Sequence, residues 1–415
     1  MSMAQRMWKV LKDYSLLLVI GALIAIIWAN TDAHSYHDFI HFNLLTNDYV
    51  GHYHNSHKEI TIHFLTNEIL MALFFAIAGK EVWEAVGLKS GSLRGKKALT
   101  PVIATVGGMV GPAGTYLLTA IVMGKMAALS NGWAIPTATD IAFSYLIGRL
   151  LFGQGHPAVQ FLLMLAIVDD AAGLVILAVF YPTKEVAPQY LLLSLGAAFL
   201  AYFLFNWLPR FLDGKNGQRL VSKFVQRTVS YWPFVVLGAV SWYGFYLAGL
   251  HPALGLLPIV PTIPHAEMDF GLFASQEGEQ EDLLNKLEHS MIGPVEVILF
   301  LFGLCNAGVE FSAMGAATWA VLAGLIIGKP IGIWLMGMFA ASTLKLGLPE
   351  GMNSRDLFLL GCIAAIGFTV SLFVATVAFA PGEVQDAAKM GALFSFGAAL
   401  LSFVVARMLK IEKQA

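Results

Sequence analysis

Two adjacent aspartates, Asp169 and Asp170, lie inside an apolar segment that reads LAIVDDAAGLVIL. At 1.5 Å per helical residue, about twelve residues of preceding helix place them roughly 18 Å along it. Two neighbouring carboxylates in a medium of low dielectric cannot both stay ionised cheaply, so their protonation is coupled. Oxygen ligands suit a hard cation such as sodium and disfavour zinc or copper. The doublet therefore predicts a site where protons and a hard cation compete, which is sufficient for antiport.

Two further ionisable residues occupy apolar segments. Asp140 closes AIPTATDIAFS, and Lys329 lies in LIIGKPIG. Such residues cost about 2.5–3.5 kcal/mol each on membrane insertion and usually mark ion pathways. Pro136 interrupts the first segment, so a half-helix is expected to end there, with a partial charge that Asp140 or Lys329 offsets. A purely structural Asp–Lys pair between helices remains the alternative for these two residues.

The composition requires that these residues be positioned by membrane helices. The chain of 415 residues is 57% hydrophobic and only 13% charged, with a mean hydropathy of +0.70, whereas soluble domains carry about 25% charged residues. A net charge of -2 without a basic block argues against a nucleic-acid partner. Helices of about 17–25 apolar residues cross a bilayer. Twelve such spans are expected, at about 14–30, 62–84, 99–123, 133–150, 157–181, 190–208, 229–248, 251–264, 292–309, 317–343, 356–380 and 387–408.

The order of these spans predicts an all-α membrane protein with a single transporter domain, residues 1–415. The spans at 99–181 and 317–408 form matching triplets, and the middle member of each is interrupted, by Pro136 and by Gly367–Thr369. This pattern is expected of inverted repeats, whose interface holds the substrate site.

Lysine and arginine residues predict the orientation. Nineteen of them fall in the termini and in alternate loops, four fall on the opposite side, and Lys80 and Lys329 lie at membrane depth. The positive-inside rule therefore places both termini and the loops at 209–228 and 265–289 in the cytoplasm. Residues 31–61 become a periplasmic loop.

The periplasmic loop is rich in histidine. Apolar residues alternate with polar ones around Phe42 and around Ile62, which predicts a β-hairpin. A zinc site is conceivable, but no ligand spacing stands out, and solvated loop histidines are the favoured interpretation. The histidines are His34, His37, His41, His52, His54, His57 and His63.

With these residues identified, the chain resembles the NhaA family of sodium/proton antiporters. The resemblance runs from about the second span to the last, in the segments TNEILMALFF, IPTATDIAFS, LAIVDDAAGLVILAVFY, LEH, CNAGV, LIIGKPIG and IGFTVSLFVATVAF. It implies twelve helices in two bundles, with two discontinuous helices that cross at mid-membrane. It also implies a homodimer, to whose contact the hairpin contributes.

The resemblance assigns roles to individual residues. Asp170 would be the principal carrier of the cation and of the proton, and Asp169 would take part beside it, paired with Lys329 in one state. Asp140 and Thr139 would lie at the helix crossing and contribute charge balance and a sodium ligand. No cofactor is implied beyond the transported ions.

Two segments depart from the family pattern. The chain reads GKEVWEAV at Gly79–Val86 where the family has GLEIKREL, and LEHSMIGP at Leu287–Pro294 where the family has LEHxLHPW. Both positions belong to the pH-sensing region of the family. The pH dependence of this chain is therefore left open.

The sequence thus predicts a transporter and not an enzyme, which exchanges Na+ or Li+ for H+ by alternating access in the bacterial inner membrane and serves pH homeostasis. Exchange of another monovalent cation such as K+, cation-coupled symport of an organic solute, and a non-transporting sensor remain alternatives. An intramembrane aspartyl protease is disfavoured, because the sequence lacks a GxGD pattern.

Overall fold

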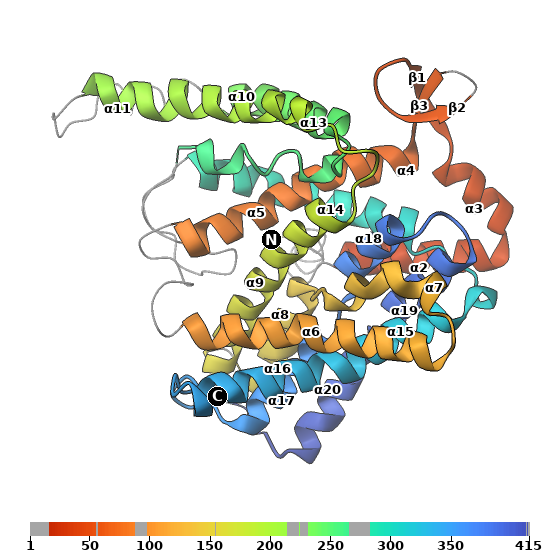
Figure 1. Cartoon of the computed structure of the whole chain (residues 1–415), viewed down its shortest axis with the longest axis vertical. Coiled ribbons are helices and arrows are strands. Elements are labelled where there is room, and N and C mark those ends of the chain that lie inside the picture. The colour runs from red at the N-terminus through yellow and green to blue at the C-terminus, as the bar shows by residue number, and fades with distance from the viewer. Residues whose placement is uncertain are drawn as a thin grey trace, which may run out of the picture. The chain divides into compact units, whose positions relative to one another are not determined.

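The structure is a computed structural model of the whole chain (Figure 1). It describes residues 16–54, 57–87, 98–153, 155–213, 224, 231–264, 283–411 and 413, without the side chains of 54, 283–289 and 292. The fold is mostly helical, as predicted. The chain divides into two compact units. Unit 1 comprises Met1–Phe42, Leu93–Ile176 and Leu299–Ala415, and unit 2 comprises Asn43–Ser92 and Leu177–Ile298.

Unit 1 contains the two interrupted segments and most of the helices. Its helices are α2 (Leu16–Thr31), α3 (Ala33–Ile40), α6 (Leu99–Val122), α7 (Met126–Leu129), the 3-10 helix η3 (Ser130–Thr137), α8 (Ile141–Phe152), α9 (Pro157–Phe180), the 3-10 turn η8 (Phe311–Ala313), α15 (Ala316–Ala323), the π-helix η9 (Gly324–Gly328), α16 (Lys329–Met338), the π-helix η10 (Phe339–Thr343), α17 (Ser354–Ala364), α18 (Phe368–Ala378), α19 (Glu383–Phe394) and α20 (Gly397–Met408).

Unit 2 combines helices with a small antiparallel sheet, whose strand order is β1-β3-β2. Its elements are β1 (Asn43–Asn47), β2 (His52–His54), β3 (His57–Thr61), α4 (Ile62–Phe64), the π-helix η1 (Leu65–Leu70), α5 (Met71–Gly87), the 3-10 turn η4 (Pro188–Tyr190), α10 (Leu191–Tyr202), the π-helix η5 (Phe203–Trp207), α11 (Leu208–Asp213), α13 (Trp232–Ala248), and the 3-10 turns η6 (Pro252–Leu254) and η7 (Val260–Thr262). The helix α14 (Leu283–Asn306) begins in unit 2, and its residues from Leu299 on belong to unit 1.

Residues 31–61 contain both a helix and strands. Residues 33–40 form α3, for which Asp32 supplies the N-cap by accepting from the backbone N–H of Ser35. The strands follow at Asn43, where β1 pairs with Thr61 of β3. The strand boundaries differ from those that the alternation predicted, because Ile62 and the residues after it are helical.

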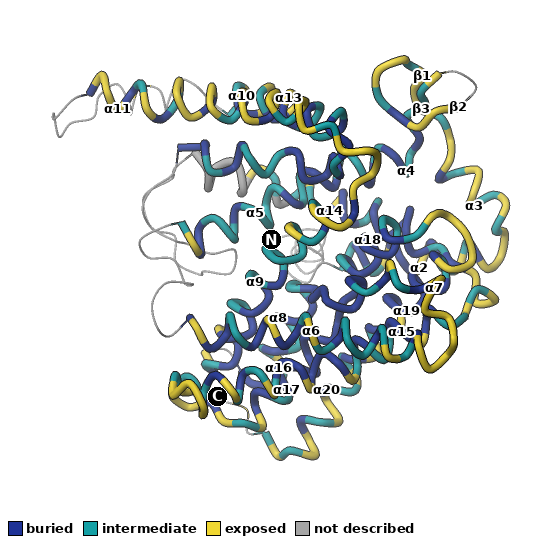
Figure 2. The backbone as a smooth tube through the Cα atoms, in the orientation of Figure 1, coloured by how far each residue is buried: buried dark blue, intermediate teal, exposed yellow. Residues whose placement is uncertain are grey.

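Six of the described helical segments are long and apolar enough to cross a membrane, and the bent pair α17–α18 would be a seventh. They differ in how much of their surface the protein itself covers (Figure 2). Half of the most apolar window is buried in 316–343 and in 383–408, against 22% in 188–213. The exposed apolar side chains of 188–213 are typical of a surface that faces lipid.

One predicted spanning helix does not form. Residues 251–264 were expected to form the eighth spanning helix, but they contain only the short turns η6 and η7. Five prolines and glycines among those fourteen residues, including Pro252 and Pro258, explain why no continuous helix forms. Of the cytoplasmic loop predicted at 265–289, residues 265–282 lie outside the described residues, and residues 283–289 form the first turns of α14.

In unit 1, α6 and α16 pack through glycines. A Cβ atom on Gly107 would collide with the carbonyl oxygen of Gly332, and one on Gly332 would collide with that of Gly107. Gly111 and Gly328 stand in the same reciprocal relation. Small residues at four-residue spacing let two membrane helices approach closely. This contact fixes the position of Lys329, which directly follows Gly328.

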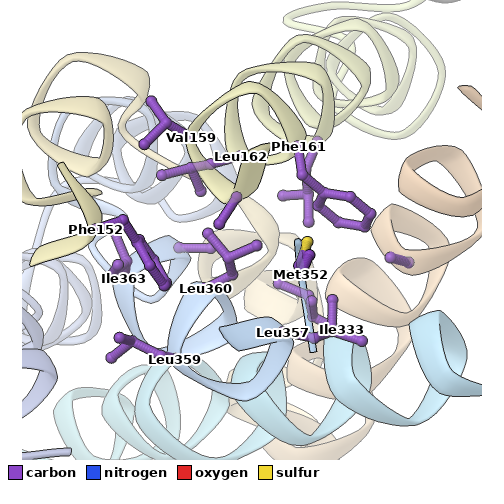
Figure 3. Packing of buried hydrophobic residues seen from close by; sticks show 14 of the residues in the cluster. Phe152, Val159, Phe161, Leu162, Ile333, Met352, Leu357, Leu359, Leu360 and Ile363 are labelled. Atoms are coloured by element: carbon purple, nitrogen blue, oxygen red, sulfur yellow. The ribbon is translucent and has the colours of Figure 1, made fainter. Parts of the chain in front are cut away.

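An apolar core lies beside this contact (Figure 3). It gathers fully buried side chains from α8, α9, α16 and α17, including Phe152, Leu162, Ile333 and Leu360. The core holds the C-terminal half of α8 and the N-terminal half of α9 against α16 and α17. It therefore supports the segments that carry Asp140, Asp169 and Lys329.

Candidate functional site

Asp140 connects the two interrupted segments of unit 1. It is the N-cap of α8, and its side chain accepts from the backbone N–H of Phe143 at 3.2 Å. The same carboxylate accepts from the backbone N–H of Thr369 at 3.3 Å and from the Thr369 hydroxyl. The backbone N–H of Asp140 donates to the carbonyl of Ile366 at 2.7 Å. One buried aspartate thus caps α8 and holds the first turn of α18.

Hydroxyl groups satisfy the carbonyls that the helix breaks expose. Thr139 donates to the carbonyl of Ala364 at 3.3 Å, and Ser144 donates to that of Ile363 at 3.1 Å. Ser371 donates to the carbonyl of Ile135 at 2.8 Å. The last carbonyls of a helix have no partner within the helix. Irregular backbone at membrane depth is tolerated only where such groups are satisfied or wet, and here each break supplies partners to the other.

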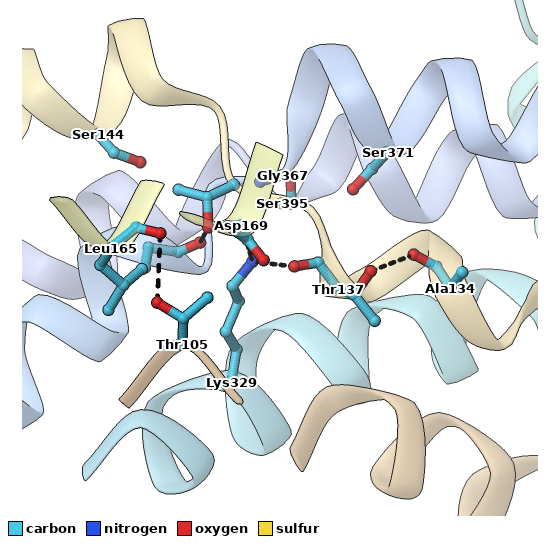
Figure 4. A network of polar contacts seen from close by, with 12 residues as sticks. Thr105, Ala134, Thr137, Ser144, Leu165, Asp169, Lys329, Gly367, Ser371 and Ser395 are labelled. Atoms are coloured by element: carbon cyan, nitrogen blue, oxygen red, sulfur yellow. Dashed lines mark hydrogen bonds and ion pairs between the residues drawn. The ribbon is translucent and has the colours of Figure 1, made fainter. Parts of the chain in front are cut away.

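Lys329 lies fully buried between η3 and α9 (Figure 4). Its Nζ donates to the carbonyl of Thr137 at 2.5 Å and to Oδ2 of Asp169 at 3.1 Å. Thr137 is the last residue of η3, where the helix end carries partial negative charge. One ammonium group therefore neutralises both a helix end and a carboxylate.

The π-helix η9 sets the direction from which Lys329 enters the site. The backbone N–H of Lys329 donates to the carbonyl of Gly324, five residues earlier. Pro330 has no N–H, so the α-helical hydrogen bond to the carbonyl of Ile326 cannot form. Isolated π turns of this kind occur frequently at functional sites.

Asp169 is nearly as buried as its partner, with 3% of its surface exposed. Besides Lys329, both the hydroxyl and the backbone N–H of Thr139 lie within hydrogen-bonding range of it. One turn earlier on α9, the carbonyl of Leu165 accepts from the hydroxyl of Thr105 at 3.3 Å. Asp169 is therefore an engaged carboxylate, with partners on α16 and at the break before α8.

Asp170 differs from the other two aspartates. It is only half-buried, and within the part of the chain that the structure describes its carboxylate has neither a hydrogen bond nor an ion pair. Its charge lies close enough to interact with those of Asp169, Asp140 and Lys329. Of the three grouped carboxylates, Asp170 is the one whose oxygens remain available to a ligand.

The five residues selected from the sequence, Asp140, Asp169, Asp170, Lys329 and Thr139, thus lie together at the helix breaks. Sequence reasoning did not identify Thr369 as the partner of Asp140, nor Ser144 and Ser371 as partners of the opposite break. The available signal was a hydroxyl residue within one turn of each interruption, as in GFTVS at 367–371.

Lys80, which the sequence places at membrane depth, and several carboxylates lie in unit 2. Lys80 is buried and forms ion pairs with Glu84 at 2.8 Å and with Glu81 at 3.9 Å. Nδ1 of His251 lies 3.6 Å from Glu68.

Comparison with known proteins gives consistent results. A family model described as Na+/H+ antiporter 1 matches residues 5–409. The chain is 61% identical over 416 residues to a Na(+)/H(+) antiporter NhaA of Jannaschia sp. (strain CCS1), with 99% of each chain covered. It is 43% identical over 418 residues to a Na(+)/H(+) antiporter NhaA of Desulfitobacterium hafniense (strain DSM 10664 / DCB-2), which covers 100% of this chain and 98% of the relative.

A solved structure shares the fold. The sodium proton antiporter MjNhaP1 from Methanocaldococcus jannaschii at pH 8 superposes with a TM-score of 0.50 at 13% sequence identity, over 96% of this chain and 92% of that chain. At this identity the likeness concerns the fold alone. The family match, by contrast, extends over nearly the whole sequence and includes every residue of the aspartate group. The chain belongs to the Na+/H+ antiporter 1 family.

Proposed function

We propose that this chain is a secondary antiporter that exchanges Na+ or Li+ for H+ by alternating access across the bacterial inner membrane. Membership of the family supports this function, as do apolar helices long enough to span a bilayer. The observation that carries the proposal is the available carboxylate of Asp170 beside two engaged ones. A site that must load and release an ion needs one ligand that the fold does not already occupy.

Asp170 is proposed to bind the cation and, in its absence, a proton. Asp169 and the hydroxyl of Thr139 are the nearest further oxygen ligands, and an oxygen-only set favours Na+ and Li+. Because a carboxylate must be deprotonated to bind a metal ion, the two substrates exclude each other. Exchange then requires only that the site be opened to one side of the membrane at a time.

Lys329 is proposed to couple the second carboxylate to this exchange. A cation that uses Asp169 as a ligand competes with the ammonium group for the same oxygen, at present 3.1 Å from Nζ. Cation binding would thus release Lys329 from its partner and favour loss of its proton. This arrangement favours two protons per cation.

Asp140 is proposed to balance helix ends and not to carry an ion. Its oxygens already accept from the backbone N–H groups of Phe143 and Thr369. These donors are at the N-termini of α8 and α18, where partial positive charge accumulates. A cation would have to displace these hydrogen bonds to use Asp140 as a ligand.

The membrane arrangement is proposed as twelve segments in inverted repeats, with both termini cytoplasmic and with the two discontinuous helices crossing. The eighth segment would consist of turns. The glycine contact supports the repeat: Gly107 and Gly328 differ by 221 positions (328 − 107), as do Gly111 and Gly332 (332 − 111). Adding 221 to the residue numbers on α6 thus gives the glycines of the second triplet. This shift turns the pair Gly107–Gly332 into the pair Gly328–Gly111, as a two-fold axis between two repeats would. A homodimer that uses strands β1–β3 completes the proposal.

The function is tested in proteoliposomes with a trapped pH-sensitive dye. Na+, Li+, K+ and choline are added in turn between pH 6 and 9, with the wild type, Asp170→Asn and the control Asp38→Asn, which alters an aspartate whose side chain is 70% exposed. The expected result is a proton flux with Na+ or Li+ that disappears only in Asp170→Asn. Proton movement with none of the cations at any pH, from folded wild-type protein, contradicts antiport and favours the sensor or the symporter.

A further inference from the structure

The short helix α3 and the residue that caps its C-terminal end, His41, place three of the histidines on one face. With 3.6 residues per turn, His34, His37 and His41 fall within an arc of about 100°, together with Asp38. The sequence alone suggested a loop, in which no ligand spacing was evident. The helix supplies that spacing, since residues four apart on a helix are neighbours on its surface.

His37 and His41 form the closest pair of this face. Their ring centres lie 4.6 Å apart, with 31° between the ring planes. The backbone N–H of His41 donates to the carbonyl of His37 at 3.1 Å, so both residues belong to the same closed turn. With metal–nitrogen distances of about 2.0–2.1 Å and tetrahedral geometry, two imidazoles on one zinc ion have ring centres about 5.2 Å apart. The observed separation is about 0.6 Å shorter, so a small rotation of the two side chains would bring the rings to that distance.

The charges around this pair favour a cation. Asp38 lies 3.5 Å from His34 on the same helix. His37 is also within electrostatic range of Asp386 on α19, to which Glu310 and Lys389 are neighbours as well. Three carboxylates against one ammonium group leave the surroundings of the histidine pair negative.

The helix that carries the pair is held rigidly. Tyr36, which precedes His37, is buried, and its hydroxyl donates to the carbonyl of Leu304 at 2.9 Å. Burial raises the pKa of Tyr36 well above its usual range, so this donor stays protonated. Trp28 packs its ring against those of Tyr36 and Phe39, at 5.9 and 5.1 Å between centres. A chelate on a fixed helix loses little conformational entropy when it binds a metal ion.

We propose that His37 and His41 chelate a divalent transition-metal ion, such as Zn2+, Ni2+ or Cu2+, at the exposed face of α3. Imidazole nitrogen suits these metals, whereas the oxygen-only group around Asp170 suits hard monovalent cations. The two sites therefore select different ions. Water is expected to complete the coordination, because in the described part of the chain no group of three or more potential metal ligands is found.

The test uses the full-length chain in detergent, with any affinity tag removed. Electron paramagnetic resonance with one equivalent of Cu2+ reports the number of coordinated imidazole nitrogens, and calorimetry with Zn2+ gives the affinity. The expected result is one Cu2+ bound by two nitrogens. Removal of a residue that only hydrogen-bonds to a metal ligand lowers metal affinity about 10- to 100-fold. His37→Gln and His41→Gln each remove a ligand itself, so each is expected to lower the affinity by at least that factor.

The matched controls are His57→Gln, which alters an exposed histidine paired with Asp48 at 2.9 Å, and His34→Gln on the same helix. Both are expected to keep the affinity of the wild type within about twofold, and gel filtration verifies the fold of every variant. Equal affinities in the wild type and in the His37→Gln/His41→Gln double variant would overturn the proposal. So would a loss in His34→Gln or His57→Gln as large as that in His41→Gln.

Discussion

Lys329 and Asp169 form a fully buried ion pair in which the ammonium group also binds the end of a helix. The lysine lies on α16 and the aspartate on α9, and their atoms are 3.1 Å apart, while the carbonyl of Thr137 lies 2.5 Å from the same Nζ. Removal of one partner from a buried pair costs about 3–5 kcal/mol, because it leaves an uncompensated charge. The pair is thus a structural element as well as a candidate for proton coupling.

Lys329→Met is therefore expected to lower the thermal stability of the detergent-solubilised protein, by an amount equivalent to about 3–5 kcal/mol. The double variant Lys329→Met/Asp169→Asn, in which neither charge remains, is expected to recover a large part of this loss. Thermal unfolding followed by tryptophan fluorescence measures both. A double variant that is less stable than Lys329→Met would contradict the pairing.

The hydroxyl of Thr369 is expected to hold the two helix breaks together through Asp140. Thr369→Val keeps the shape of the side chain but removes the donor, and loss of a hydrogen bond to a charged group costs about 1.5–3 kcal/mol. Thr369→Ser keeps the donor and is expected to retain wild-type stability within about 1 kcal/mol. Thermal unfolding of the two variants compares them directly, and equal stabilities would show that this contact contributes nothing.

Competition between protons and Na+ for Asp170 predicts how apparent affinity depends on pH. Protons occupy the carboxylate at low pH, so the half-saturating Na+ concentration is expected to rise as pH falls. The rise approaches about tenfold per pH unit for each competing proton. Proteoliposome flux at a series of Na+ concentrations between pH 6 and 9 measures it. A half-saturating concentration that is independent of pH would exclude a shared site.

The glycine contact between α6 and α16 predicts a sharp difference between neighbouring positions. Gly107→Ala would place a methyl group against the carbonyl of Gly332, and overpacking of this kind costs about 1–3 kcal/mol. The control is Gly114→Ala on the same helix, where a Cβ atom meets nothing within 4 Å. It is expected to be neutral, or stabilising by up to about 1 kcal/mol. Thermal unfolding distinguishes them, and equal effects would contradict close packing.

The grouping of the buried charges could be predicted from the sequence. Charged side chains inside apolar segments are stable only where they face the protein interior and one another. Asp140, Asp169 and Lys329 were chosen for that reason alone, and Pro136 indicated the first break. The partner of Asp140 could not be anticipated. Nothing in GFTVS specifies that Thr369, and no other hydroxyl, faces an aspartate more than two hundred residues earlier, since that depends on how two breaks pack.

The secondary structure of short segments was the second feature that the sequence did not predict correctly. Hydropathy cannot distinguish a helix from a series of turns over the fourteen residues 251–264, and there the turns η6 and η7 prevailed. The same ambiguity concealed α3, whose polar composition indicated a loop. Its helix depends on the Asp32 cap and on the burial of Tyr36. The spacing of His37 and His41 acquired a chemical meaning only with that helix.

The π turn before Lys329 has a consequence for how this sequence tolerates changes in length. With its N–H bonded five residues back to Gly324, the segment Gly324–Gly328 holds one residue more than a regular α turn would need. Deletion of Ile327 would let the turn close as an ordinary α-helix with Gly324 still one turn before the lysine, whereas a deletion within a regular α-helix rotates everything upstream by about 100°. Gly328 and Gly332, which face α6, follow the deleted position and would keep their spacing from Lys329. The π turn therefore makes this segment more tolerant of the loss of one residue than a regular helix would be.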